Sequence, residues 1–395
     1  MNILFLSTVY PAYERTGGDI ASFRYVRGLR ELGHDVDLLT YLRQGDPWPT
    51  ADGDHIAGER LIETSKAGAY AGLWMLRSLL AGVPYSAGKY RSSAYLACLR
   101  RLRAEKSYEL IVLDHCSRLA WVLPSLRLGP SDQTPLVCIS HNVEYRLYEN
   151  QQRTASSPWM KRIFGREARL VKQVEDDLAL QASEIWTLTP DDQAYYAGLE
   201  RGCPVRAFPT PPRDDEVPPA TTPKHCDIGL IGNWEWGPNA EGLKWFADAV
   251  VPLLPPSVGI RVAGRGAAYL AGRYPNLAVM GYVPDANLFM AEARVIAVPS
   301  TAGGGVQIKT LDSIALGLPV VATPFALRGI ASLPPTVRCA ESAPAYAAAL
   351  LDSIASGENP AHRQAALDWA TALRAAFREE LSAAVNAVAL EERAS

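Results

Sequence analysis

The sequence lacks the signatures of membrane-spanning, secreted and metal-stapled proteins. Its 395 residues contain no uncharged apolar run as long as the roughly 18 residues that a membrane-spanning helix needs. The apolar run at residues 3–9 has no lysine or arginine before it, unlike a secretory signal. The six cysteines stand singly, without the paired spacing of a zinc site or a disulfide framework. We therefore expect a cytoplasmic protein with reduced cysteines.

An excess of basic charge is also missing. The chain carries 39 lysines and arginines against 42 acidic residues, a net charge of −3, so no overall field attracts nucleic acid. A hydrophobic fraction of 48% and a charged fraction of 21% are ordinary for a globular protein and exclude disorder, collagen and coiled coil. At roughly 150 residues per domain, the length predicts two or three domains.

Short apolar runs alternate with amphipathic stretches, which indicates an α/β protein with parallel sheets. In the first half we expect a helix at 19–32 and strands at 2–7, 35–41, 110–114, 136–140 and 184–188. In the second half we expect strands at 227–231, 260–263, 278–282, 295–299 and 319–323, and helices at 239–254, 306–316 and 361–392. Seven prolines between residues 204 and 223 separate the halves, and we interpret this stretch as an interdomain linker.

Two such domains place the carboxyl ends of their strands at a cleft, where ligands of open α/β sheets bind. The first candidate loop there is Gly17-Gly18-Asp19, which opens the first helix. Paired glycines let backbone N–H groups approach a ligand at the positive end of the helix dipole. The alternative is a simple capping turn with Thr16 or Asp19 as the cap. The loop lacks the third glycine of the dinucleotide fingerprint, so it gives little support to a nicotinamide cofactor.

A second glycine-rich loop, Gly303-Gly304-Gly305, follows an expected strand and opens a helix. This arrangement is typical of a phosphate cradle. Lys309 lies one turn into the expected helix, where its charge can offset a diphosphate, and Asp312 can accept hydrogen bonds from sugar hydroxyls. The alternative is a flexible loop followed by an ordinary lysine–aspartate pair on a helix.

Polar residues also follow two expected strands of the first half, as Asp114-His115 and as His141-Asn142-Val143-Glu144. Side chains directly after buried strands lie at a cleft mouth, where histidines and carboxylates orient hydroxyls or transfer protons. A metal site is a further alternative for these residues, but their spacing has no recognisable metal-ligand geometry. For each residue alone, a capping or loop-tethering role is an equal alternative.

Two further segments leave their roles open. Trp234-Glu235-Trp236 can stack on a base or a sugar, or can form a packed turn that ends at a capping Asn239. The segment Met160–Lys172 holds five basic residues against one acid, with bulky apolar residues between them. Such a helix can lie on an anionic membrane surface, assisted by the apolar segment Tyr70–Tyr85, although solvated or core-packed helices remain the alternative.

Five motifs are distributed over nearly the whole chain. The opening strand is followed by GGDIASFRYVRGLRELGHDVDLLT, and HNVE stands at His141–Glu144. The second half contains IGNWEWGPNAEGLKWF, GYVPD and PSTAGGGVQIKTLDSIALGLPVVAT. Together they resemble the GT-B glycosyltransferases of the large retaining family usually called family 4. The first two are similar to its N-terminal domain and the other three to its donor-binding domain, and the last of these is the most specific.

The resemblance implies a GT-B architecture of two Rossmann-like domains that face a central cleft. Residues 1–205 would form an acceptor-binding domain, to which a final helix at about 375–395 crosses back, and residues 206–374 a domain for a nucleotide-sugar donor. Donor contacts would come from Gly17, Gly18, Gly232, Asn233, Arg265, Gly281, Tyr282, Val283, Gly303, Gly304, Gly305, Val306, Lys309 and Asp312. Asp19, Asn142 and Glu144 would contact the acceptor.

The chain departs from the family at its paired glutamates, eight positions apart, which fall on Gly304 and Asp312. Asp312 would keep the second role, on the nucleotide ribose, whereas the first carboxylate is absent. The basic pair after the first C-terminal-domain strand is also missing, so Lys309 or Arg265 would have to neutralise the leaving diphosphate. The family's active-site histidine falls on Asp114, with His115 adjacent.

We therefore expect a hexosyltransferase-like enzyme that moves a sugar from a nucleoside-diphosphate sugar to a hydroxyl acceptor, with retention and without a cofactor or metal. Asp114, His115, His141 and Lys309 are the expected catalytic residues. The acceptor can be a glycan, a lipid-linked saccharide or a small molecule, which is typical of polysaccharide biosynthesis. Two alternatives remain: an epimerase or hydrolase of the same fold, and a catalytically silent subunit that binds nucleotide sugars.

Overall fold

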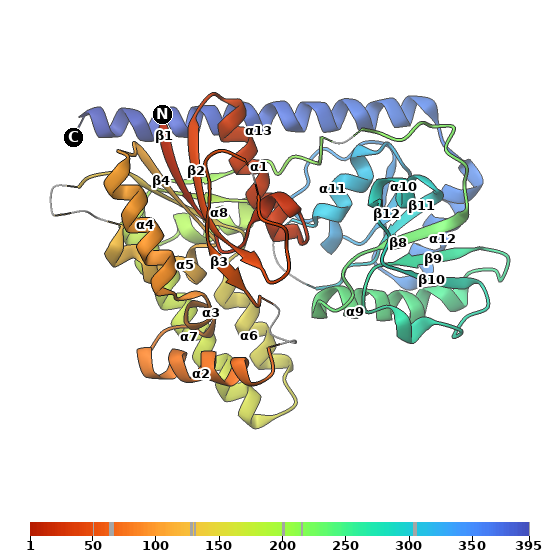
Figure 1. Cartoon of the computed structure of the whole chain (residues 1–395). Coiled ribbons are helices and arrows are strands. Elements are labelled where there is room, and N and C mark those ends of the chain that lie inside the picture. The colour runs from red at the N-terminus through yellow and green to blue at the C-terminus, as the bar shows by residue number, and fades with distance from the viewer. Residues whose placement is uncertain are drawn as a thin grey trace. The chain divides into compact units, whose positions relative to one another are not determined.

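The structure is a computed structural model (Figure 1). It describes residues 1–49, 51–62, 67–126, 129, 132–199, 202–214, 216–302 and 306–394, without the side chains of residues 390–394. The chain divides into two compact units. Unit 1 comprises Met1–Phe208 and Arg378–Ser395, and unit 2 comprises Pro209–Phe377. The sequence-based boundaries were drawn at residues 205 and 375.

Unit 1 is built on a parallel sheet of seven strands in the order β3-β2-β1-β4-β5-β6-β7. The strands are β1 (Asn2–Leu6), β2 (Asp35–Arg43), β3 (Asp54–Arg60), β4 (Leu110–Asp114), β5 (Leu136–Ser140), β6 (Glu184–Thr187) and β7 (Val205–Ala207). The strands β1, β4 and β5 are apolar runs that are buried almost throughout, as both faces of a parallel sheet require. Successive strands are added toward one edge from β1 to β3 and toward the other edge from β4 to β7, so the strand order reverses between β1 and β4. Open α/β sheets bind ligands at the carboxyl ends of the strands next to such a switch point.

Helices surround this sheet and extend beyond one end of it (Figure 1). They are α1 (Gly17–Glu31), α2 (Ala69–Ala81), α3 (Tyr85–Tyr90), α4 (Ser93–Glu105), α5 (Cys116–Leu119), α6 (Glu144–Thr154), α7 (Pro158–Gln181) and α8 (Pro190–Ala197). Helix α1 begins with a capping box, in which Thr16 Oγ1 accepts from the backbone N–H of Asp19 while the Asp19 carboxylate accepts from that of Thr16. The core includes Leu4, Leu6, Ile111, Leu113 and Cys138.

Unit 2 is built on a parallel sheet of six strands in the order β10-β9-β8-β11-β12-β13. The strands are β8 (Cys226–Ile231), β9 (Ile260–Ala263), β10 (Leu277–Gly281), β11 (Ala293–Val298), β12 (Val320–Ala322) and β13 (Val337–Cys339). Its helices are α9 (Gly237–Trp245), α10 (Ala286–Ala291), α11 (Ile308–Ala315), α12 (Ala343–Ser356) and the first part of α13 (Pro360–Ala394). Residues of α13 from Arg378 onward belong to unit 1. No helix among the described residues combines the length and apolarity needed to cross a bilayer.

The expected α/β class with two parallel sheets is confirmed, but some element predictions are wrong. The helix expected at 239–254 ends its regular part at Trp245 and continues as a π turn and a 3-10 turn. It also begins at Gly237, so Asn239 is not its cap. Strand β7 interrupts the proline-rich stretch that was interpreted as a linker from Pro204 onward. Helix α11 begins at Ile308, so Lys309 is its second residue and does not lie one turn inside.

Candidate functional site

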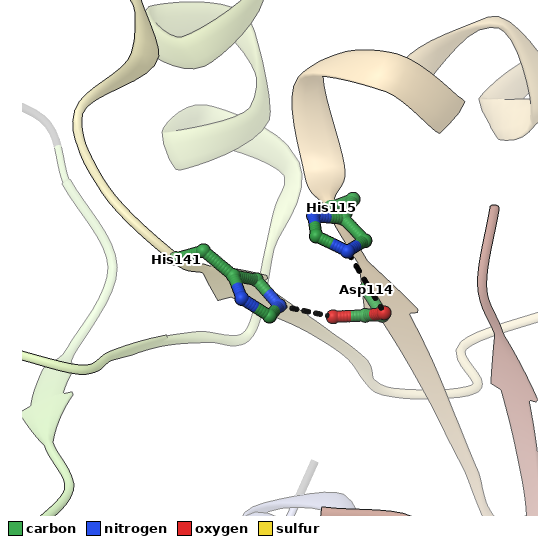
Figure 2. A group of neighbouring side chains, drawn as sticks. All are labelled: Asp114, His115 and His141. Carbon is green, nitrogen blue, oxygen red and sulfur yellow. Dashed lines mark hydrogen bonds and ion pairs between the residues drawn. The ribbon is translucent and has the colours of Figure 1, made fainter. Parts of the chain in front are cut away.

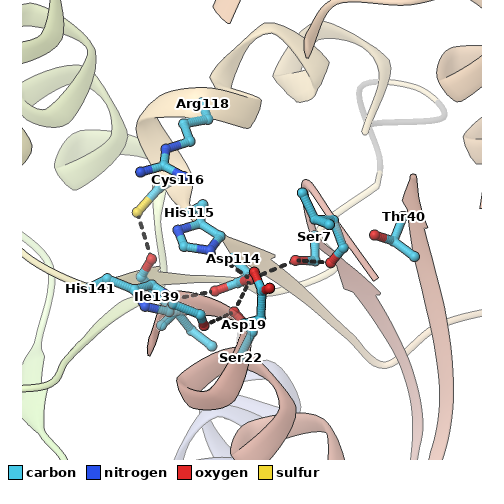
Figure 3. Close-up of polar contacts among 12 residues, drawn as sticks. Ser7, Asp19, Ser22, Thr40, Asp114, His115, Cys116, Arg118, Ile139 and His141 are labelled. Atoms are coloured by element: carbon cyan, nitrogen blue, oxygen red, sulfur yellow. Dashed lines mark hydrogen bonds and ion pairs between the residues drawn. The ribbon is translucent and has the colours of Figure 1, made fainter. Parts of the chain in front are cut away.

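A buried carboxylate, Asp114, ends β4 at the switch point of the first sheet and gathers donors from three neighbouring segments (Figures 2 and 3). Ser7, directly after β1, and Ser22, on α1, both donate to Asp114 Oδ2 at 2.7 Å. His141, directly after β5, lies with Nε2 at 2.7 Å from Asp114 Oδ1. The two serines come from segments 107 and 92 residues away, so only the fold brings them to this carboxylate.

His115 completes the cluster in a strained backbone conformation. It has a φ of 50°, in the left-handed region that β-carbon-bearing residues rarely adopt, and its ring stacks on that of His141 with centroids 4.0 Å apart. Its Nε2 lies 3.9 Å from Asp114 Oδ2. Its Nδ1 is buried, and no hydrogen-bond partner for it exists among the described residues. A buried nitrogen without a partner, next to strained backbone, is typical of a site that binds a ligand.

The charges of the cluster depend on each other. Burial by itself raises the pKa of Asp114, but the electrostatic effect of the two neighbouring histidine rings, His115 and His141, and the hydrogen bonds from His141 and Ser22 outweigh burial and hold this pKa below its ordinary value. Burial, followed by repulsion from His141, holds the pKa of His115 well below its usual range. Asp114 is therefore an anion at neutral pH, and His115 is neutral.

The paired glycines of the first loop lie beside this cluster. Gly17 is the first residue of α1, and a β-carbon at Gly18 would meet His115 Cε1 at 3.2 Å, closer than most such contacts. Asp19 is buried and forms an ion pair with Arg43, whose Nη2 lies 2.8 Å from Asp19 Oδ2. Burial raises the pKa of Asp19, and Arg43 opposes this. Thr16 and Asp19 therefore cap helix α1, which is the alternative role considered for this loop. Gly18 instead provides room for the ring of His115.

The remaining polar residues after β5 hold the start of α6. Glu144 is the first residue of α6; it accepts from Ser117 and forms an ion pair with Arg118 at 3.1 Å. The backbone N–H groups of Glu144 and Tyr145 donate to the buried Glu175 at 2.7 and 3.4 Å. Burial, with the nearby charge of Glu144, raises the pKa of Glu175 to about 8. The side-chain oxygen Oδ1 of Asn142 is buried without a hydrogen-bond partner among the described residues.

Asp114, His115 and His141 are also the group among the described residues that can hold a metal ion, with ligand atoms within 4.8 Å of one another. Sequence spacing did not indicate this geometry, because the three residues converge only through strand pairing. A metal here would have to compete with the donors that already occupy both Asp114 oxygens. The donor set is chemically suitable for zinc or a similar ion, but its carboxylate is already satisfied.

In unit 2, Lys309 is held by two residues of the loop and helix that follow β8. Its Nζ donates to Asn239 Oδ1 at 3.0 Å and lies 5.4 Å from the ring centroid of Trp234. Asn239 Nδ2 in turn donates to the carbonyl of Asn233 at 2.9 Å. Burial lowers the pKa of Lys309 to about 8, and no ion pair with a carboxylate is found for it among the described residues. Lys309 is partly buried, and an ammonium group withdrawn from water without an anionic partner costs free energy unless an anion binds there.

The loop after β8 is a packed structure. Trp234 is buried, and its Nε1 donates to the carbonyl of Ala263 at 2.8 Å, so of the two alternatives for this residue the structure has the packed turn. Gly264, with a φ of 111°, lies so close to Gly232 that a β-carbon would meet the Gly232 carbonyl oxygen at 1.8 Å. Trp236 and Arg265 are exposed. The carbonyl of Arg265 accepts from the backbone N–H of Trp234 at 2.8 Å.

The other expected donor residues lie at the same carboxyl edge of the second sheet. Gly281 ends β10 with a φ of 66°, Tyr282 is 72% exposed, and Val283 packs on the core. Asp312 is buried on α11, and its Oδ1 accepts from the backbone N–H of Arg213 at 3.0 Å. Val306 is half-buried before α11. The expected diphosphate loop, Gly303–Gly305, lies outside the described residues.

Sequence reasoning missed Ser7, Ser22, Arg43 and Asn239. Ser7 directly follows β1, as His141 directly follows β5, so a search of the polar residues after each apolar run could have found it. Ser22 and Arg43 carried no such signal. The sequence pattern indicates a cap for Asn239, whereas the structure has it in a hydrogen bond with Lys309, 70 residues away in the chain.

Comparisons with known proteins agree with this architecture. Residues 225–355 match the family model described as "Glycosyl transferases group 1". No match is found among curated protein sequences. Sucrose-phosphate synthase from Thermosynechococcus elongatus has a TM-score of 0.63 and 18% identity, over 99% of this chain and 97% of its own.

Two further solved structures are similar over almost their full lengths. WaaG, a glycosyltransferase involved in lipopolysaccharide biosynthesis, has a TM-score of 0.61 and 17% identity, over 98% of this chain and 99% of its own. Anabaena HepE, solved in complex with UDP and glucose, has a TM-score of 0.60 and 14% identity, over 98% of this chain and 99% of its own. The chain therefore has the GT-B fold of two Rossmann-like domains, and its residues 225–355 are similar to group 1 glycosyl transferases.

Proposed function

We propose that this protein is a glycosyltransferase that moves a sugar from a nucleoside-diphosphate sugar to a hydroxyl acceptor, with retention at the anomeric carbon and without a metal. The observation that carries the proposal is Lys309, a partly buried ammonium group held by Asn239 without a carboxylate partner among the described residues. A diphosphate supplies the anion that such a group needs. The match of residues 225–355 to group 1 glycosyl transferases supports the same assignment.

In this proposal unit 2 binds the donor. Lys309 contacts the diphosphate and stabilises the negative charge that grows on it as the bond to the sugar breaks. Asn239 and Trp234 position the ammonium group before the donor arrives, so little reorganisation is required. Gly303–Gly305 would add backbone N–H groups, Asp312 would contact the ribose, and Gly281 to Val283 would border the base.

Unit 1 binds the acceptor. Because His141 Nε2 faces the Asp114 anion, the proton of a neutral imidazole is on Nε2, and Nδ1 carries the free lone pair. This nitrogen orients the acceptor hydroxyl and takes its proton while the hydroxyl oxygen bonds to the anomeric carbon. The bond from the anomeric carbon to the diphosphate oxygen breaks on the same face of the sugar, so the configuration is retained, and the diphosphate leaves with the electron pair. Asp114 stabilises the imidazolium that forms, in the manner of an aspartate–histidine pair.

The experiment is a thermal-shift screen of the purified chain against nucleotide sugars, followed by transfer assays with the donor that binds. A donor at 100 times its Kd should stabilise the fold by about 2.7 kcal/mol. Product with the anomeric configuration of the donor supports the proposal. Rapid donor consumption without an acceptor would instead indicate an epimerase or hydrolase. Donor binding without turnover across a broad set of acceptors would indicate a silent binding subunit.

A further inference from the structure

Helix α2 has too little polar surface for an exposed helix. Its 13 residues, AYAGLWMLRSLLA, include one charged side chain, Arg77. Only the stripe formed by Trp74 and Ser78 is fully buried. A helix that is apolar all round is normally buried on all sides. Figure 1 shows α2 at the end of unit 1 that lies away from the sheet.

Four leucines and a tyrosine of α2 are exposed. The exposed fraction is 63% for Tyr70, 41% for Leu73, 50% for Leu76, 56% for Leu79 and 80% for Leu80. Leu73, Leu76 and Leu80 follow helical spacing on the side away from Trp74 and Ser78. Large apolar side chains gathered on one surface element typically mark an interaction surface, whereas exposed leucines scattered singly need no explanation.

The start of helix α7 packs on the side of α2 that carries Ser78, and it has exposed apolar side chains and charge of one sign. Arg166 donates to Ser78 Oγ and to the Ser78 carbonyl, both at 3.0 Å, and so ties α7 to α2. Trp159 is 67% exposed and Met160 is 38% exposed. Lys161, Arg162 and Arg169 are exposed as well.

The acidic residue of this segment does not weaken the positive charge at the surface. Glu167 is buried, where it accepts from the backbone N–H of Tyr85 at 2.7 Å and pairs with Arg166. Over α2 and residues 159–169, the exposed ionic groups are therefore all basic.

We propose that α2 and the first turns of α7 form a face that binds an anionic lipid bilayer. The leucines of α2 and Trp159 enter the interface, and Lys161, Arg162 and Arg169 contact acidic headgroups. Apolar side chains beside exclusively basic charge, with an aromatic residue at the edge, are the composition of helices that lie in a membrane interface. Each basic residue near an anionic surface strengthens binding about fivefold.

Flotation of the full-length protein with lipid vesicles tests this proposal. Vesicles of equal parts phosphatidylglycerol and phosphatidylcholine should bind at least ten times more protein than pure phosphatidylcholine vesicles. Salt at about 0.5 M should weaken binding to the anionic vesicles, because it screens the attraction between the basic side chains and the headgroups. The triple variant Leu73→Ser/Leu76→Ser/Leu80→Ser should reduce binding at least tenfold. The variant Lys161→Glu/Arg162→Glu/Arg169→Glu should do the same.

Matched controls are Leu180→Ser, an exposed leucine near the other end of α7, and Arg100→Glu, an exposed arginine of α4. Both should bind vesicles like the wild type, and circular dichroism melting establishes that all variants fold. Absence of wild-type binding to anionic vesicles would overturn the proposal, as would unchanged binding by both triple variants. A dimer that the leucine variant abolishes, without vesicle binding by the wild type, would assign the face to a second copy of the chain instead.

Discussion

The imidazole rings of His115 and His141 stack with an interplanar angle of 15° and centroids 4.0 Å apart, beside the single carboxylate of Asp114. Two stacked imidazolium ions would repel each other strongly. Burial and the neighbouring His141 hold the pKa of His115 well below its usual range, so His115 stays neutral at physiological pH. Of the two rings, His141 is the one that bonds directly to Asp114, at 2.7 Å.

The first prediction concerns His141. His141→Gln should lower kcat about 100-fold, in the range for loss of a proton-transferring group, and should leave donor affinity unchanged because donor binding resides in unit 2. Steady-state kinetics and donor titration of the folded variant measure both quantities. His34→Gln, which removes a histidine outside the cluster, is the control and should keep the wild-type kcat. A His141→Gln enzyme with the wild-type rate would remove His141 from the mechanism.

The second prediction concerns Lys309. Lys309→Ala should cut turnover well over tenfold while the fold survives, because the leaving diphosphate loses its ammonium partner. Lys244→Ala is the matched control, since Lys244 is an exposed lysine of α9 that pairs with Asp248. Transfer kinetics and melting temperatures should be measured for both variants. Unchanged transfer by a folded Lys309→Ala protein would refute the role.

The third prediction follows from the pKa of Lys309, which burial lowers to about 8. As pH rises through 8, the ammonium group of the free enzyme loses its proton, and donor binding then requires proton uptake. The donor Kd should therefore increase about tenfold between pH 7 and pH 9. In Lys309→Arg the guanidinium stays charged, so the Kd should change little over this range. Isothermal titration provides the test, and equal pH dependence in both proteins would contradict it.

The fourth prediction concerns the stability of unit 1. Burial and the charge of Glu144 raise the pKa of Glu175 from its ordinary value to about 8 in the folded protein. At a pH between the ordinary pKa of a glutamate and about 8, the Glu175 carboxyl group is ionised in the unfolded chain and protonated in the folded chain. The contribution to stability is therefore complete below about pH 4.5 and is lost as pH rises toward 8, by at most about 1.4 kcal/mol per pH unit.

Urea unfolding at pH 5, 6, 7 and 8 measures this slope. Glu175→Gln cannot ionise, so its unfolding free energy should depend less on pH than that of the wild type. Glu149→Gln, at an exposed position of α6, is the control and should keep the wild-type slope. The interpretation fails if Glu175→Gln and the wild type lose stability in parallel.

The fifth prediction concerns metal. Because Ser7, Ser22 and His141 already occupy the oxygens of Asp114, we expect that prolonged treatment with a chelator leaves transfer activity unchanged. Activity and bound metal, measured by elemental analysis, should be followed in the same samples. If activity is lost and returns with zinc or manganese, the cluster of Asp114, His115 and His141 is a metal centre, and the proposed proton transfer by His141 is wrong.

The local sequence pattern was sufficient to predict the positions of the central strands and of most of the helices for which a prediction was made. The strands β1, β4 and β5 are apolar runs because both of their faces are buried, and the run itself is visible in the sequence. The strands β3, β7 and β13 were not predicted. They lie near or at sheet edges, and β7 and β13 have three residues each, so pairing with a neighbouring strand stabilises them more than burial does.

The sequence by itself determined which polar residues lie at the carboxyl ends of the strands, because that position follows from the apolar run before them. Only the tertiary structure decided their partners. Ser22 reaches Asp114 from 92 residues away, and Asn239 reaches Lys309 from 70 residues away. Side-chain hydrogen bonds act over about 3 Å, whereas their sequence separation depends on strand order and helix packing, which no local pattern encodes. The charge states of Asp114, His115 and Lys309 therefore arise from the fold.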